Sequence, residues 1–255
     1  MKNCQRIFVF SLFMLLSLLS VNDNVTAQES YPDYLGDEVT DVDFIEDDES
    51  RDIYISDPLE PINRVFFEFN DVLYEWVLKP VTDGYMWVFP LELRQSFGNF
   101  FSNIAMPIRL LNSLLQGNLE QSGIVVQRFL INSTLGVYGF ADIADVEFGV
   151  KARRADFGQT LGKWGMGEGI YLFWPVLGPS SVRGSIGRVV DAFSHPLPYV
   201  NDNQTFEISY YTTDRVNHLS LNREAYEDLK RFSVDPYVAS RQAYYEYRRS
   251  LVKDN

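Results

Sequence analysis

Apolar residues recur every three or four positions between Pro58 and Leu78, and this spacing predicts an amphipathic helix. Asp57 before Pro58 is a typical helix start, and Lys79-Pro80 predicts its end. The opposite face carries a charged stripe, which argues against a membrane span and suits a helix that lies at a lipid interface or borders a water-facing space. The apolar positions are Leu59, Ile62, Val65, Phe66, Phe67, Phe69, Val72, Leu73, Trp76 and Val77.

Similar spacing continues through most of the remaining chain. Residues 90–117 read as two helical pieces broken at Pro107, and two or three helices are expected after residue 204. No run of alternating strands and no βαβ unit stands out, so we expect a mostly α fold with an irregular middle. Capping residues mark later helix starts: Asn118 with Gln121 three positions on, Ser180 or Ser181, and Asp235 before Pro236.

The segment from residue 157 to residue 184 alternates glycines with large apolar side chains. Gly165, Gly167 and Gly169 lack the spacing of a phosphate-binding loop, and no predicted strand precedes them. Glycine instead permits φ > 0 or a close backbone approach, so we expect a steric role. The aromatic stretch "IYLFWPVLGP" that follows is hairpin-like, and two interpretations stay open: a buried core loop, or a segment that enters lipid or lines an apolar passage.

The first 27 residues have the pattern of a secretory signal peptide. Lys2 and Arg6 precede an apolar run over residues 7–21, and "VTA" at residues 25–27 is a small-residue cleavage site. We expect cleavage after Ala27 and export of the chain. Cys4 is the one cysteine, and it would leave with the signal, so we expect a mature chain without a disulfide and without an acylated cysteine.

Charge divides the rest of the chain into two parts. The net charge is −13 in total, but twelve acidic residues and one base, Arg51, fall between residues 28 and 57. Residues 28–56 are therefore expected to form an acidic, disordered linker, although aromatic residues within it leave a docking segment open. The remaining body is nearly neutral, which argues against binding of nucleic acid. The hydrophobic content of the full chain, 46%, is enough for a sizeable core.

No constellation typical of an enzyme or a metal site is visible. His195 and His218 have no metal-ligand spacing, and we interpret His195 as a structural histidine in a loop. No nucleophile elbow occurs. The carboxylates Asp142, Asp145 and Glu147 are explained by helix capping and solvation. We therefore expect no catalytic residue, no metal and no cofactor.

Five segments, in order, resemble the MlaA/VacJ family of outer-membrane phospholipid-transport proteins. They span roughly residues 57–245, and the glycine block is the most distinctive. The segments are "DPLEPINRVFFEFNDVLYEWVLKPV", "FGNFFSNIAMPIRLLNSLLQGN", "RFLINSTLGVYGFADIA", "FGQTLGKWGMGEGIYLFWPVLGPSSVRGSIGRVVDAF" and "DPYVASRQAYY".

The resemblance implies a helical, ring-like domain over residues 57–252, embedded in the inner leaflet of the outer membrane around an amphipathic channel. It implies phospholipids, trimeric outer-membrane porins and a periplasmic lipid carrier as partners. The implied function is removal of misplaced phospholipids from the outer leaflet, without hydrolysis. A non-catalytic structural envelope protein associated with porins is the alternative. Family members are typically lipoproteins, and the missing cysteine after the signal departs from that pattern.

Two groups of site residues follow from this resemblance together with the helix pattern. The first helix is expected to border the channel, because one face could be wet while the other is apolar. The glycines are expected to form a loop that shapes the opening. The channel residues would be Asn63, Phe66, Phe69, Asn70 and Leu73, and the glycine loop would contain Gly158, Gly162, Gly165, Gly167 and Gly169.

Overall fold

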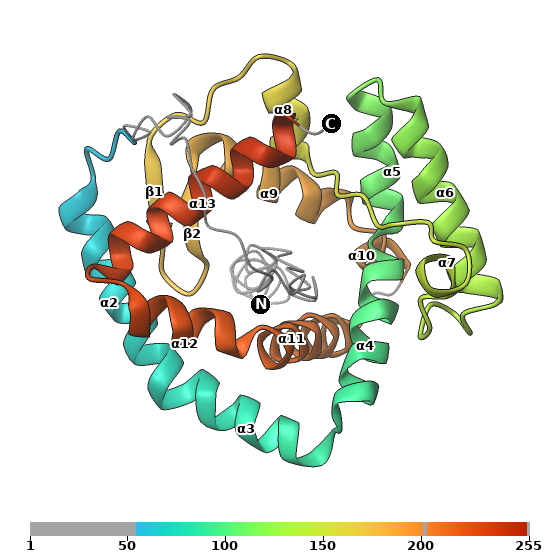
Figure 1. Ribbon diagram of the computed structural model, residues 1–255, viewed down its shortest axis with the longest axis horizontal. Helices are drawn as coiled ribbons and strands as arrows, with labels where there is room; N and C mark the ends of the chain where they lie inside the picture. Colours follow the sequence, from blue (N-terminus) through green and yellow to red (C-terminus); the bar gives the residue numbers. More distant parts are fainter. Residues whose placement is uncertain (1–54, 201–202, 254–255) are drawn as a thin grey trace, which may run out of the picture.

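Helices that follow one another around a circle make up most of the structure (Figure 1). The computed structural model describes residues 55–200 and 203–253. The mostly α fold expected from the sequence is confirmed. The first half contains α2 (Glu60–Leu73), the π-helix η1 (Tyr74–Leu78), α3 (Lys79–Val88), α4 (Leu91–Ile104), α5 (Met106–Leu115), α6 (Leu119–Thr134) and α7 (Ile143–Val146). The second half contains α8 (Phe157–Lys163), β1 (Tyr171–Trp174), β2 (Gly178–Ser181), α9 (Val182–Ser194), α10 (Leu197–Val200), α11 (Gln204–Leu221), α12 (Arg223–Phe232) and α13 (Pro236–Lys253).

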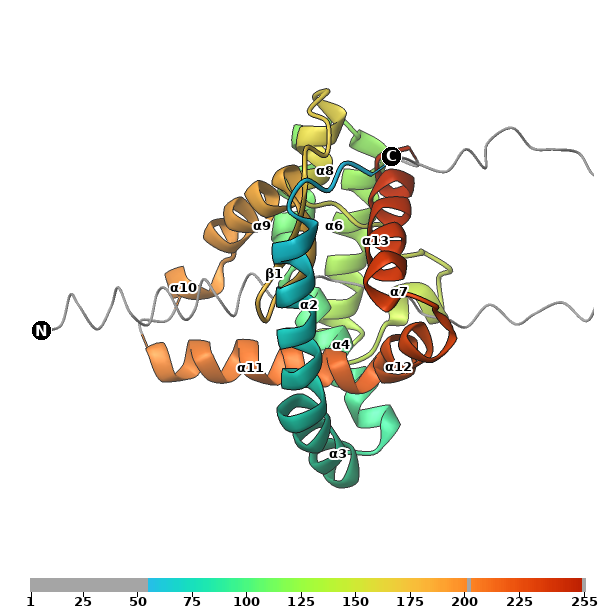
Figure 2. The ribbon, with the colours of Figure 1, turned by 90° about the vertical axis from the view of Figure 1, so that its left-hand side faces the viewer.

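Helix α11 runs across this circle instead of along it. Figure 1 shows α11 almost end-on inside the other helices, and Figure 2 shows it perpendicular to the line of α2 and α3. It packs against α3 and α4. Helices α12 and α13 lie toward the opposite side from α10 (Figure 2). No helix within the described ranges is both long and apolar enough to span a membrane.

The helix that begins at Glu60 does not end near Pro80, where the sequence pattern predicted its end. It continues through η1 into α3 and stops at Val88. The N–H of Lys79 bonds to the carbonyl of Tyr74, five residues back, so the helix is widened by one residue just before the proline. A wider turn accommodates a proline ring that would clash with the carbonyl four residues back in an ordinary helix.

Asp57 does not cap that helix, which begins at Glu60 without a side-chain cap. Its carboxylate, only 2% exposed, instead accepts hydrogen bonds from Asn63 Nδ2 at 2.8 Å, from the Tyr237 hydroxyl, and from Arg241 Nη1 at 2.9 Å. Asp57 therefore ties the start of α2 to α13. A local pattern could not reveal this role, since the partners lie some 180 residues away in sequence.

The other predicted caps are confirmed. Asn118 accepts from the Gln121 N–H at 2.9 Å, Ser181 from the Gly184 N–H at 3.0 Å, and Asp235 from the N–H groups of Tyr237 and Val238. The break near Pro107 is also present, between α4 and α5. Asp142 caps the short helix α7.

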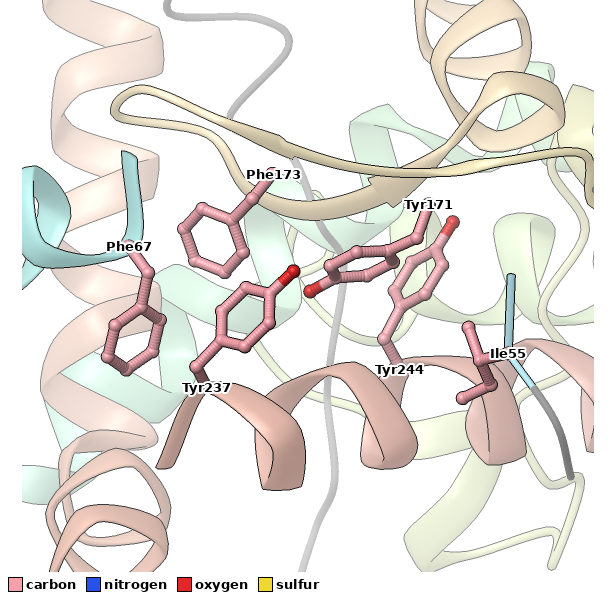
Figure 3. Packing of buried hydrophobic residues seen from close by; sticks show 6 residues of the cluster. All are labelled: Ile55, Phe67, Tyr171, Phe173, Tyr237 and Tyr244. Carbon is pink, nitrogen blue, oxygen red and sulfur yellow. The ribbon is translucent and has the colours of Figure 1, made fainter. Parts of the chain in front are cut away.

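An aromatic cluster joins α2, the hairpin and α13 (Figure 3). The hairpin-like segment is an antiparallel β-hairpin in which Tyr171 lies opposite Ser181. The interpretation as a buried core element holds for Tyr171 and Phe173, which are 0% and 5% exposed. Ile55 also joins the cluster. The signal peptide and the acidic segment up to residue 54 lie outside the described residues.

Two helices cross at glycines. A Cβ on Gly187 of α9 would lie 2.4 Å from the backbone nitrogen of Gly158 in α8, and one on Gly162 would lie 2.9 Å from Arg183 Nη1. Gly158 and Gly162 both lie in helix α8, so the expectation that they belong to a loop is wrong. Gly165 and Gly169 have φ of 92° and 73°, which favours glycine.

Gly167 differs from its neighbours, because its φ is not positive and no atom lies within 4 Å of the point that a Cβ would occupy. The steric role expected for this glycine is therefore wrong. A side chain at residue 167 would meet open space, whereas one at residue 187 would meet backbone.

We predict that Gly187→Ala lowers the free energy of unfolding by about 1–3 kcal/mol, the usual cost of overpacking. Gly167→Ala is the matched control, and it should leave stability unchanged or raise it by up to about 1 kcal/mol. Denaturant unfolding in detergent measures both. Equal effects of the two substitutions would contradict the assignment of the α8–α9 contact.

Candidate functional site

A cavity of about 190 Å³ lies between α4, α5, α9, α11 and α13, next to the segment that leads into α8. Its walls combine aromatic and aliphatic side chains with several charged groups. No group of His, Cys, Asp and Glu side chains within the described residues is arranged to hold a metal ion. The charges of the cavity are compensated in different ways.

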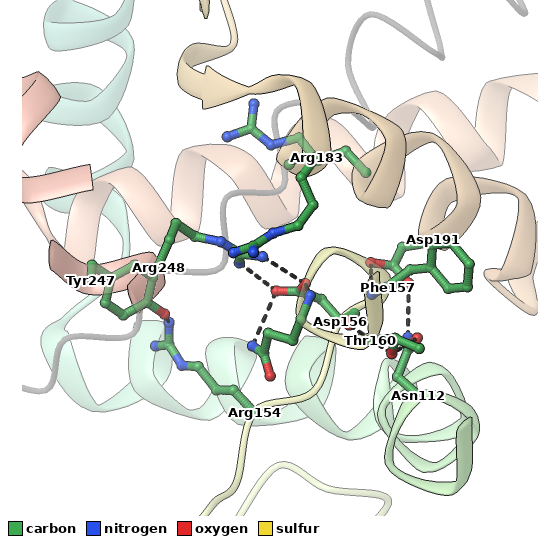
Figure 4. Close-up of polar contacts among 12 residues, drawn as sticks. Asn112, Arg154, Asp156, Phe157, Thr160, Arg183, Asp191, Tyr247 and Arg248 are labelled. Carbon is green, nitrogen blue, oxygen red and sulfur yellow. Dashed lines mark hydrogen bonds and ion pairs between the residues drawn. The ribbon is translucent and has the colours of Figure 1, made fainter. Parts of the chain in front are cut away.

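An ion pair joins α8 to α13 at the cavity wall (Figure 4). Arg248 donates from Nη1 and Nη2 to the two carboxylate oxygens of Asp156, at 2.6 and 2.9 Å. Asp156 also caps α8 through the Gln159 N–H. Burial opposes the ionisation of Asp156, but Arg248 and the Gln159 N–H outweigh it and hold the pKa of this carboxyl below its usual range. These two charges compensate each other directly.

Asp191 of α9 is held by uncharged donors. It accepts from Asn112 Nδ2 at 2.9 Å and from the Phe157 N–H at 3.0 Å (Figure 4). Burial and the neighbouring charge of Asp156 raise the pKa of Asp191 to about 7. Its protonation therefore changes near neutral pH.

Arg109 of α5 and Asp214 of α11 border the same cavity. Arg109 is 6% exposed and donates from Nη1 to Ser102 Oγ at 2.9 Å. Burial, together with the charge of Arg154, lowers the pKa of Arg109 to about 10. Burial raises the pKa of Asp214 to about 6, against the opposing effect of Arg215 and Arg109.

His195 has the structural role that its loop position indicated. It is 8% exposed, its Nδ1 accepts from the Leu197 N–H at 3.3 Å, and burial lowers its pKa to about 4. The ring is thus neutral at physiological pH. It packs against Tyr211 and Tyr210, with centroids 5.3 and 5.8 Å away.

The five residues expected to line a channel do not reach this cavity. Asn63 and Asn70 instead bind the hairpin backbone: Asn63 accepts from the Phe173 N–H at 2.8 Å, and Asn70 from the Val176 N–H at 2.6 Å. Phe66 packs against the aromatic cluster, Phe69 is 50% exposed, and Leu73 is half-buried. The seven-residue spacing of the asparagines did place them on one face, but that face meets the hairpin.

The charged residues of the cavity were missed by the sequence pattern. One signal was available: Arg109 interrupts the apolar sequence "MPIRLLNSLL", where a charge on a packed helix needs a reason. Asp214 carries no comparable signal, because α11 is polar along much of its length.

Comparisons with known proteins agree with this fold. The family model described as "MlaA lipoprotein" matches residues 55–251. A protein of Rickettsia bellii is 33% identical over 205 residues, which is 80% of this chain and 78% of the relative. The Escherichia coli K12 protein named "Intermembrane phospholipid transport system lipoprotein MlaA" is 31% identical over 195 residues, 75% of this chain and 76% of its own.

A solved structure is also similar. It was reported as "Structural basis for maintenance of bacterial outer membrane lipid asymmetry" and aligns with a TM-score of 0.68 at 29% identity, covering 77% of this chain and 99% of its own. Relatives are named lipoproteins, so the comparisons give no support to the expectation that this chain lacks an acyl group.

We predict that Asp191 contributes a loss of stability as pH rises from about 4 to 7, and that Asp191→Asn removes this contribution. The folded pKa of Asp191 is raised, so the folded state binds more protons than the unfolded state between the two pKa values. Stability then falls as pH rises through that window, by about 1.4 kcal/mol for each pKa unit of difference. Melting temperatures measured across this range test it, and identical slopes for the two proteins would contradict it.

Proposed function

The chain belongs to the MlaA lipoprotein family, and from this premise we propose that it transports phospholipids between the membranes of a Gram-negative envelope. It removes misplaced phospholipids from the outer leaflet of the outer membrane and passes them toward the inner membrane, which maintains lipid asymmetry. The match to the family model over residues 55–251 carries this proposal.

The distribution of side chains supports it. Among the described residues, buried polar and charged side chains outnumber buried hydrophobic ones, while many large hydrophobic side chains are exposed. Trp76 and Trp87 of the η1–α3 stretch are 79% and 89% exposed. Apolar surface on this scale marks contact with lipid or protein. A polar interior behind an apolar exterior suits a protein that gives a lipid headgroup a path while it rests in a bilayer.

The partners and the location belong to the same proposal. Trimeric porins would hold the protein beside the outer leaflet, and a periplasmic carrier would receive the lipid. The protein would lie in the inner leaflet of the outer membrane and act without catalysis. Its cavity, lined by both charges and aromatic rings, favours lipid handling over the alternative, a purely structural envelope protein.

Purification in mild detergent tests the function. Extracted lipid should contain intact phospholipid in a fixed ratio to protein, and incubation with labelled phospholipid should yield no hydrolysed or transferred product. Co-purifying proteins would identify the porin. A preparation free of phospholipid would favour the structural alternative, and turnover would reopen an enzymatic function.

We predict that Trp76→Glu combined with Trp87→Glu shifts the protein from the membrane fraction to the soluble fraction. Each exposed tryptophan contributes about 1.5–3 kcal/mol if it is buried in lipid, and this contribution is insensitive to salt. Fractionation before and after a high-salt wash measures the shift, with the Trp76→Phe and Trp87→Phe pair as control. Full retention of the glutamate pair would mean that another anchor, such as an acyl chain detectable by intact mass, holds the protein.

A further inference from the structure

Arg109 and Asp214 differ from the other charged pairs at the cavity. Arg109 forms no ion pair with a described residue, and Asp214 forms neither a hydrogen bond nor an ion pair with one. Arg248 and Asp156, by contrast, compensate each other directly. Arg109 and Asp214 thus line the same cavity and are close enough to influence each other, but they form no ion pair. Asp191, a second carboxylate of the lining, is instead held by Asn112 and the Phe157 N–H.

Such an arrangement is costly in a folded protein. A charge removed from water is stabilised only by an opposite charge or by several hydrogen bonds. Arg109 is 6% exposed and has Ser102 Oγ and the Met106 sulfur as its partners. Two charges of opposite sign in one cavity, neither of them held in an ion pair, fit a ligand that itself carries both signs.

The surroundings of Asp214 favour an ammonium group. Tyr210 and Tyr211 precede it by four and three positions on α11, so they lie on its side of the helix. Their rings meet edge to face, with centroids 5.0 Å apart at 85°. The neutral ring of His195 packs against both. Aromatic faces beside a carboxylate attract an organic ammonium ion by cation–π and ionic contact.

The surroundings of Arg109 favour a phosphate. A guanidinium group offers several N–H donors in one plane and binds phosphate oxygens in pairs. One Nη of Arg109 is engaged by Ser102, which fixes the side chain and leaves further donors at the cavity. No carboxylate competes for them through an ion pair within the described residues.

The size of the cavity limits the ligand to a headgroup. Sites that enclose a whole drug-sized molecule measure about 300–1,000 Å³, and this cavity is about 190 Å³. The two acyl chains of a phospholipid must therefore lie elsewhere while the polar end is bound.

We propose that this cavity binds the zwitterionic headgroup of an aminophospholipid, with its phosphate at Arg109 and its ammonium at Asp214. The proposal rests on the proposed function, since it assumes that phospholipid reaches the cavity. It adds a selectivity: phosphatidylglycerol has the phosphate but no ammonium, so it would leave Asp214 uncompensated. Phosphatidylethanolamine satisfies both charges.

The test measures which lipid the protein takes from vesicles of equimolar phosphatidylethanolamine and phosphatidylglycerol. The purified full chain is incubated with the vesicles and re-isolated, and its bound lipids are quantified. We expect the wild-type protein to hold roughly fivefold more of the ethanolamine lipid, the scale of one cation–π or ionic contact. Asp214→Asn should bring the ratio close to one.

Two further variants separate selectivity from folding. Asp228→Asn removes an exposed carboxylate on α12, outside the cavity, and should keep the wild-type ratio. Arg109→Gln should lower binding of both lipids alike, since both have the phosphate. Asp214→Asn should melt no lower than the wild type, because burial disfavours the charge of Asp214 more strongly than Arg215 and Arg109 stabilise it.

The outcomes are distinguishable. Bound lipid in the proportions of the vesicle, measured on the wild-type protein alone, would overturn the headgroup site and leave the transport function intact. An unchanged ratio in Asp214→Asn would overturn the site as well. A wild-type protein that holds no phospholipid would overturn both the site and the proposed function.

Discussion

Buried polar groups must find hydrogen-bond partners, and this requirement organises the whole structure, because its interior is more polar than apolar. Asparagine side chains supply many of these partners by hydrogen bonding to the backbone of distant elements. Asn63 and Asn70 hold the hairpin, and Asn217 of α11 donates to the Arg94 carbonyl and accepts from the Tyr85 hydroxyl. Each such contact specifies both distance and direction, which apolar packing alone does not. Helices arranged in a circle, with little core between them, need this kind of connection.

Two ionic contacts connect α13 to the residues that precede α2 and α8. Asp57, just before α2, accepts hydrogen bonds from Tyr237 and Arg241, and Asp156, just before α8, accepts them from Arg248. Because both carboxylates are compensated within the protein, α13 is fixed across α2 and α8, and the wall of the cavity that it forms is fixed with it. The close contact of Gly158 with Gly187 brings α9 to the same place.

The local features of this fold could be predicted from the sequence, and the long-range ones could not. Asn118, Ser181 and Asp235 each cap a helix by accepting from an N–H only two or three positions further along the chain, and these caps were predicted correctly. The role of Asp57 depends on α13, so the same Asp-Pro pattern gave a wrong cap there. Continuation of the helix past Pro80 depends on a π-turn, which no pattern of apolar residues signals.

The candidate site was hidden for a related reason. Helical periodicity tells which residues share a face, but it does not tell what the face meets. For a soluble protein the apolar face is buried by default, whereas here apolar side chains such as Trp76 and Trp87 point outward and polar ones are enclosed. In a protein with that distribution, a charge within an apolar helix is more informative than the apolar stripe around it. Arg109 is the clearest case: it is enclosed at the cavity, while Leu111 and Leu114 of the same helix are exposed. The charges that the helices enclose, and not their apolar faces, therefore indicate where a polar ligand would bind.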